Sequence, residues 1–507
     1  MRRKMAANFV RHSVSTMNQA VIKSETPLLA SPKIAIIGGG VAGSTIALRF
    51  AELGIDTSLI EKGDSLVNGP PICHLHAGGN LYREISDEQC LTLLQQSIDT
   101  VKVYPQSVNK RPTVIALPIN DPGHPLDLLP RLEKLRAKYA SLVQQDASNK
   151  VLGEPEQYFR LFERAEIDAL KELPLPEEAR CPSDWLVAFA QNVELDNLQF
   201  PIFLVQEYGL SAFRFAAIAS MAIDNLPDCH LHTNTQVRGL EQLTGASGWR
   251  VSMERHNENE IIYADFDYVI NACGFKSGEI DDMLNAKRRR MVEFKAAYVA
   301  HWPKCKGLWP EVIFYGERGT PQGMAQLTPY PDGYFQLHGM TQDITLFNNG
   351  LVASCENSAQ PKLAERFINK IERQWPAELI EERTLGSIEH IAQYIPSFSQ
   401  ASVAAKPLFG AQQIPGDDAG LRAADVSFYG KHYARTEIVK ASSALAAADA
   451  ILHDLIANEL VNSTLIEQYA TKHYFPVTGQ CTQEEVTARA ELLAEQRQYP
   501  EALAKNF

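Results

Sequence analysis

The 507-residue chain has no apolar run that approaches the about 20 residues needed to cross a bilayer. The longest apolar stretch, around Leu210 to Ile223, is interrupted by Arg214. Basic residues are also in deficit, since 61 acidic residues against 48 basic ones leave a net charge of −13. Nucleic acids and anionic lipids bind basic surfaces, so we expect neither as a partner. The lack of a long apolar run predicts no transmembrane segment.

Paired cysteines are missing as well. The eight cysteines are scattered, with no CxxC pair and no histidine-rich spacing, so we predict neither a disulfide framework nor a metal site. A reducing, cytoplasmic location is therefore expected. Residues 1–31 contain five basic residues but no apolar segment of a secretory signal, and we expect a disordered or targeting-like extension there.

What the chain does contain is a complete β-α-β unit between Lys33 and Glu61. A short β-branched run over 33–37 predicts a buried strand, residues 44–53 have helical spacing, and 57–60 predict a second strand. The turn between the first strand and the helix reads Gly38, Gly39, Gly40, Val41, Ala42 and Gly43. This order matches the fingerprint of a dinucleotide-binding turn.

Each residue type in this unit has a physical reason. Gly38 permits the tight turn, Gly40 leaves room for a pyrophosphate beside the backbone, and Gly43 lets the helix pack closely on the strand. Glu61 follows the glycines by about 20 residues, where a carboxylate accepts ribose hydroxyls and repels a 2′-phosphate. The pattern predicts an adenine dinucleotide, with FAD, NAD and NADP still open.

Several later blocks accompany this unit. A loop over 69–83 contains two histidines and a Gly-Gly pair, and a strand ends at 271–274 in Asn-Ala-Cys-Gly. Residues 290–338 alternate as strands of an antiparallel segment, and an alanine-rich helix is expected from Glu437 to Ile456. The run 288–290, three arginines, is interpreted as a solvated turn.

In this order, the blocks resemble the D-amino acid oxidase superfamily of FAD-dependent oxidoreductases, which includes sarcosine, glycerol-3-phosphate and L-2-hydroxyglutarate dehydrogenases or oxidases. The resemblance covers roughly Lys33 to Ile456. It rests on the glycine turn with Glu61-Lys62, the His76-Ala77-Gly78-Gly79 loop, the Thr235-Gln236-Val237 strand, the Asn271-Ala272-Cys273-Gly274 strand end and the loop before the last helix.

The resemblance implies FAD as the cofactor and an α/β fold with a discontinuous Rossmann-like FAD-binding domain. Segments 33–110, 196–289 and 396–460 would form that domain. An antiparallel-sheet α+β substrate domain would consist of 111–195 and 290–395, followed by a helical tail over 461–507.

The resemblance also implies contacts to the cofactor. Besides the turn residues, Glu61 and Lys62, the implied set is His76, Ala77, Gly78, Val237, Ala272, Gly274 and Thr436. The helix after Arg435 would point its N-terminus at the flavin. In the dimethylglycine dehydrogenase branch a histidine in a similar loop is covalently joined to FAD, and for His76 a covalent link, a non-covalent contact and a structural role all stay open.

Such enzymes oxidise a C–H bond next to nitrogen or oxygen by passing hydride to flavin N5. An anionic substrate would need an arginine clamp, since a guanidinium binds a carboxylate through two hydrogen bonds. The candidate arginines are Arg83, Arg422 and Arg435, with Tyr334, Tyr429 or Tyr433 as hydrogen-bond partners. His338 and His432 are the candidate bases.

The expected function is thus FAD-dependent oxidation of a small, carboxylate-bearing amine or 2-hydroxy acid. One alternative is a flavoprotein that acts on a protein partner as a modification or assembly factor, and a further one is an NAD(P)-dependent Rossmann dehydrogenase. The electron acceptor stays open between O2, a quinone and another carrier. A quinone would require peripheral membrane contact, for which the sequence offers no basic amphipathic segment.

Overall fold

The computed structural model describes residues 31–68, 75–77, 83, 85–243, 248–256, 260–424, 426–464 and 475–506. The expected extension over 1–31 therefore lies almost entirely outside the described residues. Among the residues described, no helix is both long enough and apolar enough to cross a bilayer.

A six-stranded sheet holds the β-α-β unit found in the sequence. Its strand order is β21 (Val426–Phe428), β22 (Tyr433–Thr436), β13 (Tyr268–Asn271), β1 (Ile34–Ile37), β2 (Thr57–Ile60) and β9 (Cys229–His232). All pairings are parallel except that of β21 with β22. Parallel strands buried on both faces explain why β1 is apolar at every position.

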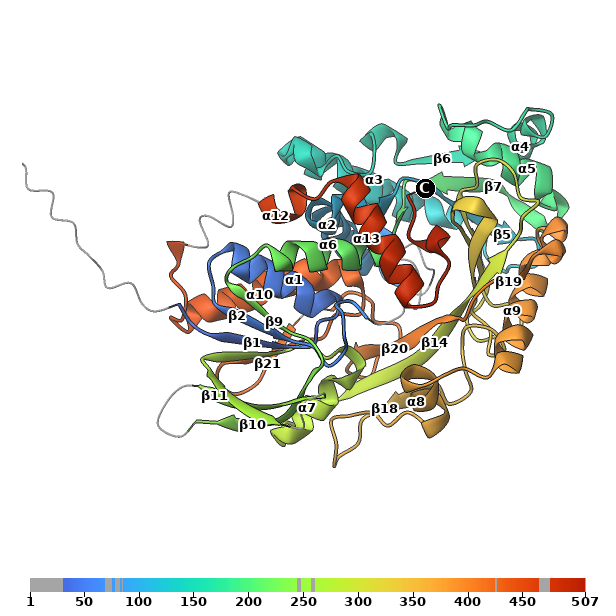
Figure 1. The fold of residues 1–507 in the computed structure, drawn as a ribbon. Coiled ribbons are helices and arrows are strands. Elements are labelled where there is room, and N and C mark those ends of the chain that lie inside the picture. The colour runs from blue at the N-terminus through green and yellow to red at the C-terminus, as the bar shows by residue number, and fades with distance from the viewer. Residues whose placement is uncertain are drawn as a thin grey trace, which may run out of the picture.

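Helices cover one face of this sheet and a small sheet covers the other (Figure 1). Ile34 and Ile36 pack against α1 (Val41–Glu52), α6 (Ala212–Asp224) and α10 (Ala444–Ala457). The alternate residues Ala35 and Ile37 pack toward β10 (Thr235–Gln242), β11 (Trp249–Arg255) and β12 (Ile261–Phe266). The sheet is therefore the middle layer of three.

A ten-stranded, mainly antiparallel sheet forms the second half of the molecule. Its main order is β18 (Leu351–Ala353), β14 (Arg290–His301), β17 (Tyr334–Gly339), β16 (Ala325–Pro329), β15 (Glu311–Phe314), β5 (Thr113–Pro118), β7 (Leu198–Val205) and β6 (Phe159–Phe162), with β19 (Ser402–Val403) and β20 (Leu408–Pro415) paired to β14. A second three-stranded sheet joins β3 (Leu75–Ala77), β8 (Tyr208–Leu210) and β4 (Val108–Asn109). The mixed α/β class expected from the sequence is confirmed.

Helices cover the large sheet on both faces. One face packs under α9 (Ala377–Ala392), and the other packs on α2 (Asp87–Val103) and α3 (Leu129–Gln145). The remaining helices are α4 (Arg164–Leu170), α5 (Val187–Asn192), α7 (Ser277–Met283), α8 (Glu365–Glu372), α12 (Pro476–Gly479) and α13 (Gln483–Gln496).

Three details differ from the sequence-based expectation. Strands β7 and β20 pair within the large sheet, although they were expected in the FAD-binding segments 196–289 and 396–460. The reason for β20 is that β14 is long enough to pair with it along Arg290 to Ala297. The alanine-rich helix begins at Ala444 and not at Glu437, because the backbone is still extended at Lys440.

Candidate functional site

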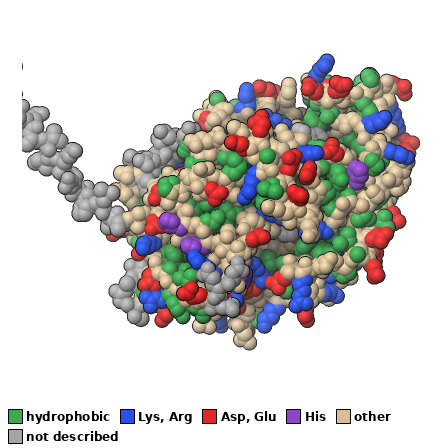
Figure 2. Space-filling model, in the orientation of Figure 1, with side chains coloured by type: hydrophobic (Ala, Val, Ile, Leu, Met, Phe, Trp, Pro, Cys, Tyr) green, Lys and Arg blue, Asp and Glu red, His purple; other side chains and the backbone are tan. Residues whose placement is uncertain are grey.

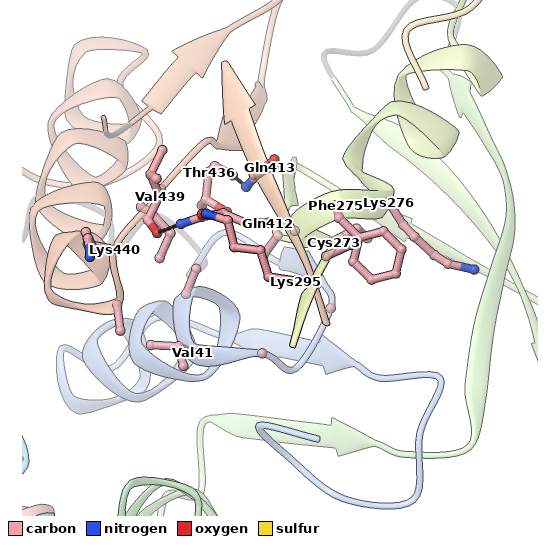
Figure 3. Close-up of a pocket in the computed structure, with 18 of the residues that line it drawn as sticks. Val41, Cys273, Phe275, Lys276, Lys295, Gln412, Gln413, Thr436, Val439 and Lys440 are labelled. Carbon is pink, nitrogen blue, oxygen red and sulfur yellow. Dashed lines mark hydrogen bonds between the residues drawn. The ribbon is translucent and has the colours of Figure 1, made fainter. Parts of the chain in front are cut away.

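A cavity of about 1020 Å3 lies between the two large sheets. Its walls come from the carboxyl end of β1, the start of α1, β10 and the loop after β13 on one side, and from β14, β17 and β20 on the other. Figure 3 shows residues from both sides, among them Val41 and Cys273 opposite Lys295 and Gln412. The carboxyl ends of parallel strands are where ligands bind in open α/β sheets.

The glycine turn has the geometry that the sequence predicts. Gly38 has a φ of +104°, and a Cβ there would lie 2.6 Å from the carbonyl oxygen of Ala272. A Cβ on Gly43 would lie 1.8 Å from the carbonyl oxygen of Gly38, so only glycine allows the helix to approach so closely. At Gly40, in contrast, a Cβ would meet no protein atom within 4 Å, and this residue lines the cavity.

Glu61 lies at the edge of the cavity and fixes the turn. Its Oε2 accepts a hydrogen bond of 2.6 Å from the Gly39 amide, and its Oε1 accepts one of 2.7 Å from Gly63. Each carboxylate oxygen retains a further lone pair for a ribose hydroxyl. Lys62 also lines the cavity, where burial and the neighbouring Lys276 lower its pKa.

Six more of the predicted cofactor contacts lie on the same cavity. Val41, Ala42, Val237, Ala272, Gly274 and Thr436 all line it. Val237 lies at a bulge in β10, and Gly274 has a φ of +56°. The carbonyl of Thr436 accepts a hydrogen bond of 2.9 Å from the Gln413 side chain.

The loop with the predicted covalent attachment site is only partly described. His76 and Ala77 belong to β3, whose backbone pairs with β8, while Gly78 lies outside the described residues. A covalent link, a non-covalent contact and a structural role therefore all stay open for His76.

The far end of the cavity is cationic. Lys295, Arg318 and Arg422 line it, and the buried carboxylate of Glu293 contacts Lys295 at 2.7 Å and pairs with Arg318. Three cations face one anion, so this group has an excess of positive charge. We refer to Glu293, Lys295, Arg318 and Arg422 as the cationic cluster.

Burial dominates the electrostatics of this cluster. Burial lowers the pKa of Lys295, and the positive charges of Arg422 and Arg318 lower it further. The negative charge of Glu293 acts in the opposite direction and offsets this only in part. Burial alone would raise the pKa of Glu293, but the nearby cations outweigh it and leave that pKa below its ordinary value. Lys295 also donates to Gln412 Oε1 at 3.1 Å, and Gln412 donates to the carbonyl of Val439 at 2.8 Å (Figure 3).

Two of the predicted catalytic residues line this end. His338 is buried on β17, opposite Gln326 of β16. Arg83 reaches the cavity wall with its guanidinium 5.1 Å from the centre of the Tyr315 ring, and it also pairs with Asp121 at 2.8 Å.

The other three predicted catalytic residues, His432, Tyr433 and Arg435, are not among the residues that line the cavity. The Arg435 guanidinium and the Tyr433 hydroxyl both donate to the buried carboxylate of Asp281, at 2.6 and 2.9 Å. His432 lies at the amino end of β22, where its ring contacts the carbonyl of Asp267 at 3.0 Å. Their contacts are those of packing at the sheet, and a catalytic role for these three residues stays a prediction.

Arg290 corrects another expectation. It was interpreted as part of a solvated turn, yet it is buried and donates to Asp281 at 2.5 Å. Glu437 completes the group by pairing with Arg288 at 2.5 Å and with Arg290 at 3.5 Å.

Sequence reasoning missed Lys295, Arg318, Gln412 and Gln413 as cavity residues. The sequence pattern could have indicated Lys295. Glu293 and Lys295 are two residues apart and therefore share a face of a strand that is apolar at its other positions between Met291 and Ala300. Charged pairs buried in a strand are rare enough to mark a site.

No protein-family model and no curated protein sequence matches the chain. Solved structures with a similar fold include glycine oxidase from Geobacillus kaustophilus, with a TM-score of 0.55 and 13% identity over 84% of this chain and 95% of that one. L-amino acid deaminase from Proteus vulgaris has a TM-score of 0.54 and 14% identity over 88% and 96%. L-alpha-glycerophosphate oxidase from Mycoplasma pneumoniae, with FAD bound, has a TM-score of 0.53 and 13% identity over 86% and 95%. The chain therefore shares the fold of these two oxidases and this deaminase.

Proposed function

We propose that this protein is an FAD-dependent oxidoreductase that oxidises the C–H bond next to nitrogen or oxygen in a small, carboxylate-bearing amine or 2-hydroxy acid. The observation that carries the proposal is one continuous cavity with a dinucleotide turn at one end and the cationic cluster at the other. An enzyme of this kind must hold a flavin and an anionic substrate side by side.

The residues at the first end fit FAD. Gly40 leaves open space where a Cβ would stand against a pyrophosphate, and the N-terminus of α1 directly follows it with unpaired amides. Glu61 suits an unphosphorylated ribose, which favours FAD or NAD over NADP. The structure with FAD bound from Mycoplasma pneumoniae supports the choice of FAD.

The residues at the second end fit a carboxylate. The excess positive charge of the cationic cluster offers ammonium and guanidinium donors in a largely buried setting, where charge-assisted hydrogen bonds are strong. His338 lies on β17, which pairs with the strand of Lys295, and would accept the proton from the substrate amine or hydroxyl at a ring nitrogen. A bound flavin supplies the hydride acceptor.

The first test is the visible absorption spectrum of the purified protein, before and after acid precipitation. Absorption near about 450 nm that moves to the supernatant indicates non-covalent FAD, whereas colour in the pellet makes His76 the leading attachment site. Anaerobic bleaching with amino acids, N-methyl amino acids and 2-hydroxy acids then identifies the substrate, with the matching amides as uncharged controls.

Three outcomes contradict the proposal. A colourless protein that also fails to take up added FAD would favour the NAD(P)-dependent alternative. A flavoprotein that no small acid bleaches would favour action on a protein partner. Equal bleaching by acids and by their amides would remove the role of the cationic cluster.

A further inference from the structure

The segment that follows Glu61 folds back against the glycine turn. The Val67 amide donates to the carbonyl of Gly39 at 2.8 Å. The Leu66 side chain lies so close that a Cβ on Gly39 would be 2.6 Å from its Cδ2. Residues 65–67 thus form the outer wall of the turn, and we call them the buttress segment.

The buttress segment has an unfavourable backbone conformation. Val67 has a φ of +48°, in the left-handed region that β-branched residues avoid because Cβ clashes with the backbone. Such a conformation persists only where the surroundings hold it. The contacts of residues 65–67 should therefore include groups that maintain it.

Arg497, just past the end of α13, supplies such contacts. Its guanidinium donates to the carbonyls of Val67 and Leu66 at 2.9 and 2.8 Å, and to the hydroxyl of Ser65 at 3.3 Å. A planar guanidinium with several fixed donors can bind consecutive carbonyls in one orientation. Burial of the guanidinium also lowers the pKa of Arg497.

The C-terminal segment that carries Arg497 is itself fixed at both halves of the molecule. Helix α13 lies along α6, with Val486, Ala490 and Leu493 buried (Figure 1). Beyond Arg497, the Tyr499 hydroxyl donates to the carbonyl of Pro407 at 2.8 Å, and Lys505 pairs with Asp332 at 2.8 Å. The position of the guanidinium is thus set by contacts far from the turn in sequence.

We propose that Arg497 is a positioning residue of the dinucleotide site, which holds Val67 in its left-handed conformation and thereby fixes the Gly39 turn for the cofactor. The proposal rests on the proposed function for the identity of the ligand. The effect of Arg497 on the conformation of Val67 does not depend on the proposed function, since the contacts are within the protein.

The test compares Arg497→Met with Arg489→Met, an exposed position on the same helix. Apoproteins of both variants and of the wild type are titrated with FAD by fluorescence. We expect Arg497→Met to raise the Kd for FAD at least tenfold and Arg489→Met to leave it unchanged. Hydrogen exchange in the apoproteins should accelerate at Val67 and Gly39 in Arg497→Met but not along α6.

A second variant shows whether the effect passes through Val67. Glycine adopts a positive φ without the Cβ clash, so in a Val67→Gly background the loss of the guanidinium should matter less. We expect Arg497→Met to raise the Kd no more than about threefold there, compared with tenfold in the parent.

The outcomes separate the two proposals. If wild-type apoprotein does not bind FAD, the proposed function fails and this one fails with it. If the wild type binds FAD and Arg497→Met binds equally well, or loses the same factor with Val67→Gly present, only the positioning role is overturned. Faster exchange throughout α6 would mean that Arg497 stabilises the tail in general and would also overturn it.

Discussion

Gly40 has only a hydrogen atom at the position where every other residue type has a Cβ. The backbone there has a φ of −70°, which any residue can adopt, and a Cβ would meet no protein atom. Glycine is therefore not needed for the fold at this position, in contrast to Gly38 and Gly43. We therefore expect any cost of a side chain at Gly40 to come from a ligand that approaches the backbone.

We accordingly expect Gly40→Val to fold normally but to lose FAD, with a Kd raised at least 100-fold. Gly386→Val is the control, since a Cβ at Gly386 also meets open space but lies in α9, outside the cavity. Far-ultraviolet circular dichroism and flavin content check the two variants. A Gly40→Val protein that retains a full complement of flavin would contradict the assignment of the turn.

Lys295 should set the pH range of substrate binding. An ammonium binds a carboxylate only while protonated, and burial lowers the pKa of Lys295 below that of a free lysine. Substrate affinity should thus be highest below this lowered pKa and fall as the pH rises through it. Guanidinium groups in general stay charged in this pH range, so the loss should be partial.

We expect Lys295→Met to raise KM at pH 7 by about 10–100-fold, the equivalent of about 1.4–2.7 kcal/mol, and to abolish the alkaline loss of affinity. The exposed Lys304→Met serves as the control. Steady-state kinetics between pH 6 and pH 10 provides the measurement. An unchanged pH profile in Lys295→Met would show that another group titrates.

Between the elements, the buried group around Asp281 joins α7 to β14 and β22. Its carboxylate accepts hydrogen bonds from Arg290, Arg435 and Tyr433, all of them buried. Removing one partner of a buried ion pair leaves the other charge without compensation, which typically costs about 3–5 kcal/mol. Stability, and not catalysis, should be the main contribution of Arg435.

Asp281→Asn should therefore lower the free energy of unfolding by about 3 kcal/mol, measured by urea denaturation. The matched control is Asp265→Asn, whose exposed partner Arg250 on β11 lies 2.7 Å away. Exposed pairs contribute about 1 kcal/mol or less. Equal losses in the two variants would show that the buried group is not a stabilising network.

The two ends of the cavity differ in how far the sequence predicts them. The dinucleotide end follows from consecutive residues, because strand, glycine turn and helix form a local unit with its own spacing rules. The substrate end is assembled from β14, β17 and two loops that are distant in sequence. The sequence indicated His338, Arg83 and Arg422 as candidates there, but not Lys295 or Arg318.

Strand alternation also explains why the sequence does not fix the contacts of β22. Tyr433 and Arg435 share a face because they are two residues apart, but the sequence does not say what that face meets. In the structure it meets α7 and Asp281, while Thr436 lines the cavity. His432 lies at the amino end of this strand, whereas the carboxyl end borders the cavity.

For the whole molecule, the surface and the cavity differ in charge. Acidic and basic side chains are interspersed on the face shown in Figure 2, and the chain carries a net charge of −13. The cationic cluster is therefore a local feature within an acidic protein. Attraction of an anionic substrate must depend on short-range contacts in the cavity, since the overall charge repels it.

The two large sheets should respond to FAD as one unit, because residues of both line the same cavity and β14 and β20 run along it. A ligand that binds only the folded state stabilises it by about 2.7 kcal/mol at 100 times its Kd. With the enthalpy and entropy of unfolding expected for a chain of this length, that corresponds to a rise in Tm of about 3 °C. Each further tenfold increase in FAD should add about 1 °C, since it contributes about 1.4 kcal/mol.

Scanning calorimetry of the apoprotein over a range of FAD concentrations measures this effect. NADP is the control ligand and should produce no shift, because Glu61 repels its 2′-phosphate. A single transition that moves with FAD would mean that both sheets unfold together. Two transitions of which only one moves would instead show that the ligand couples to the six-stranded sheet alone, and that the cavity wall formed by β14 and β17 contributes little to cofactor binding.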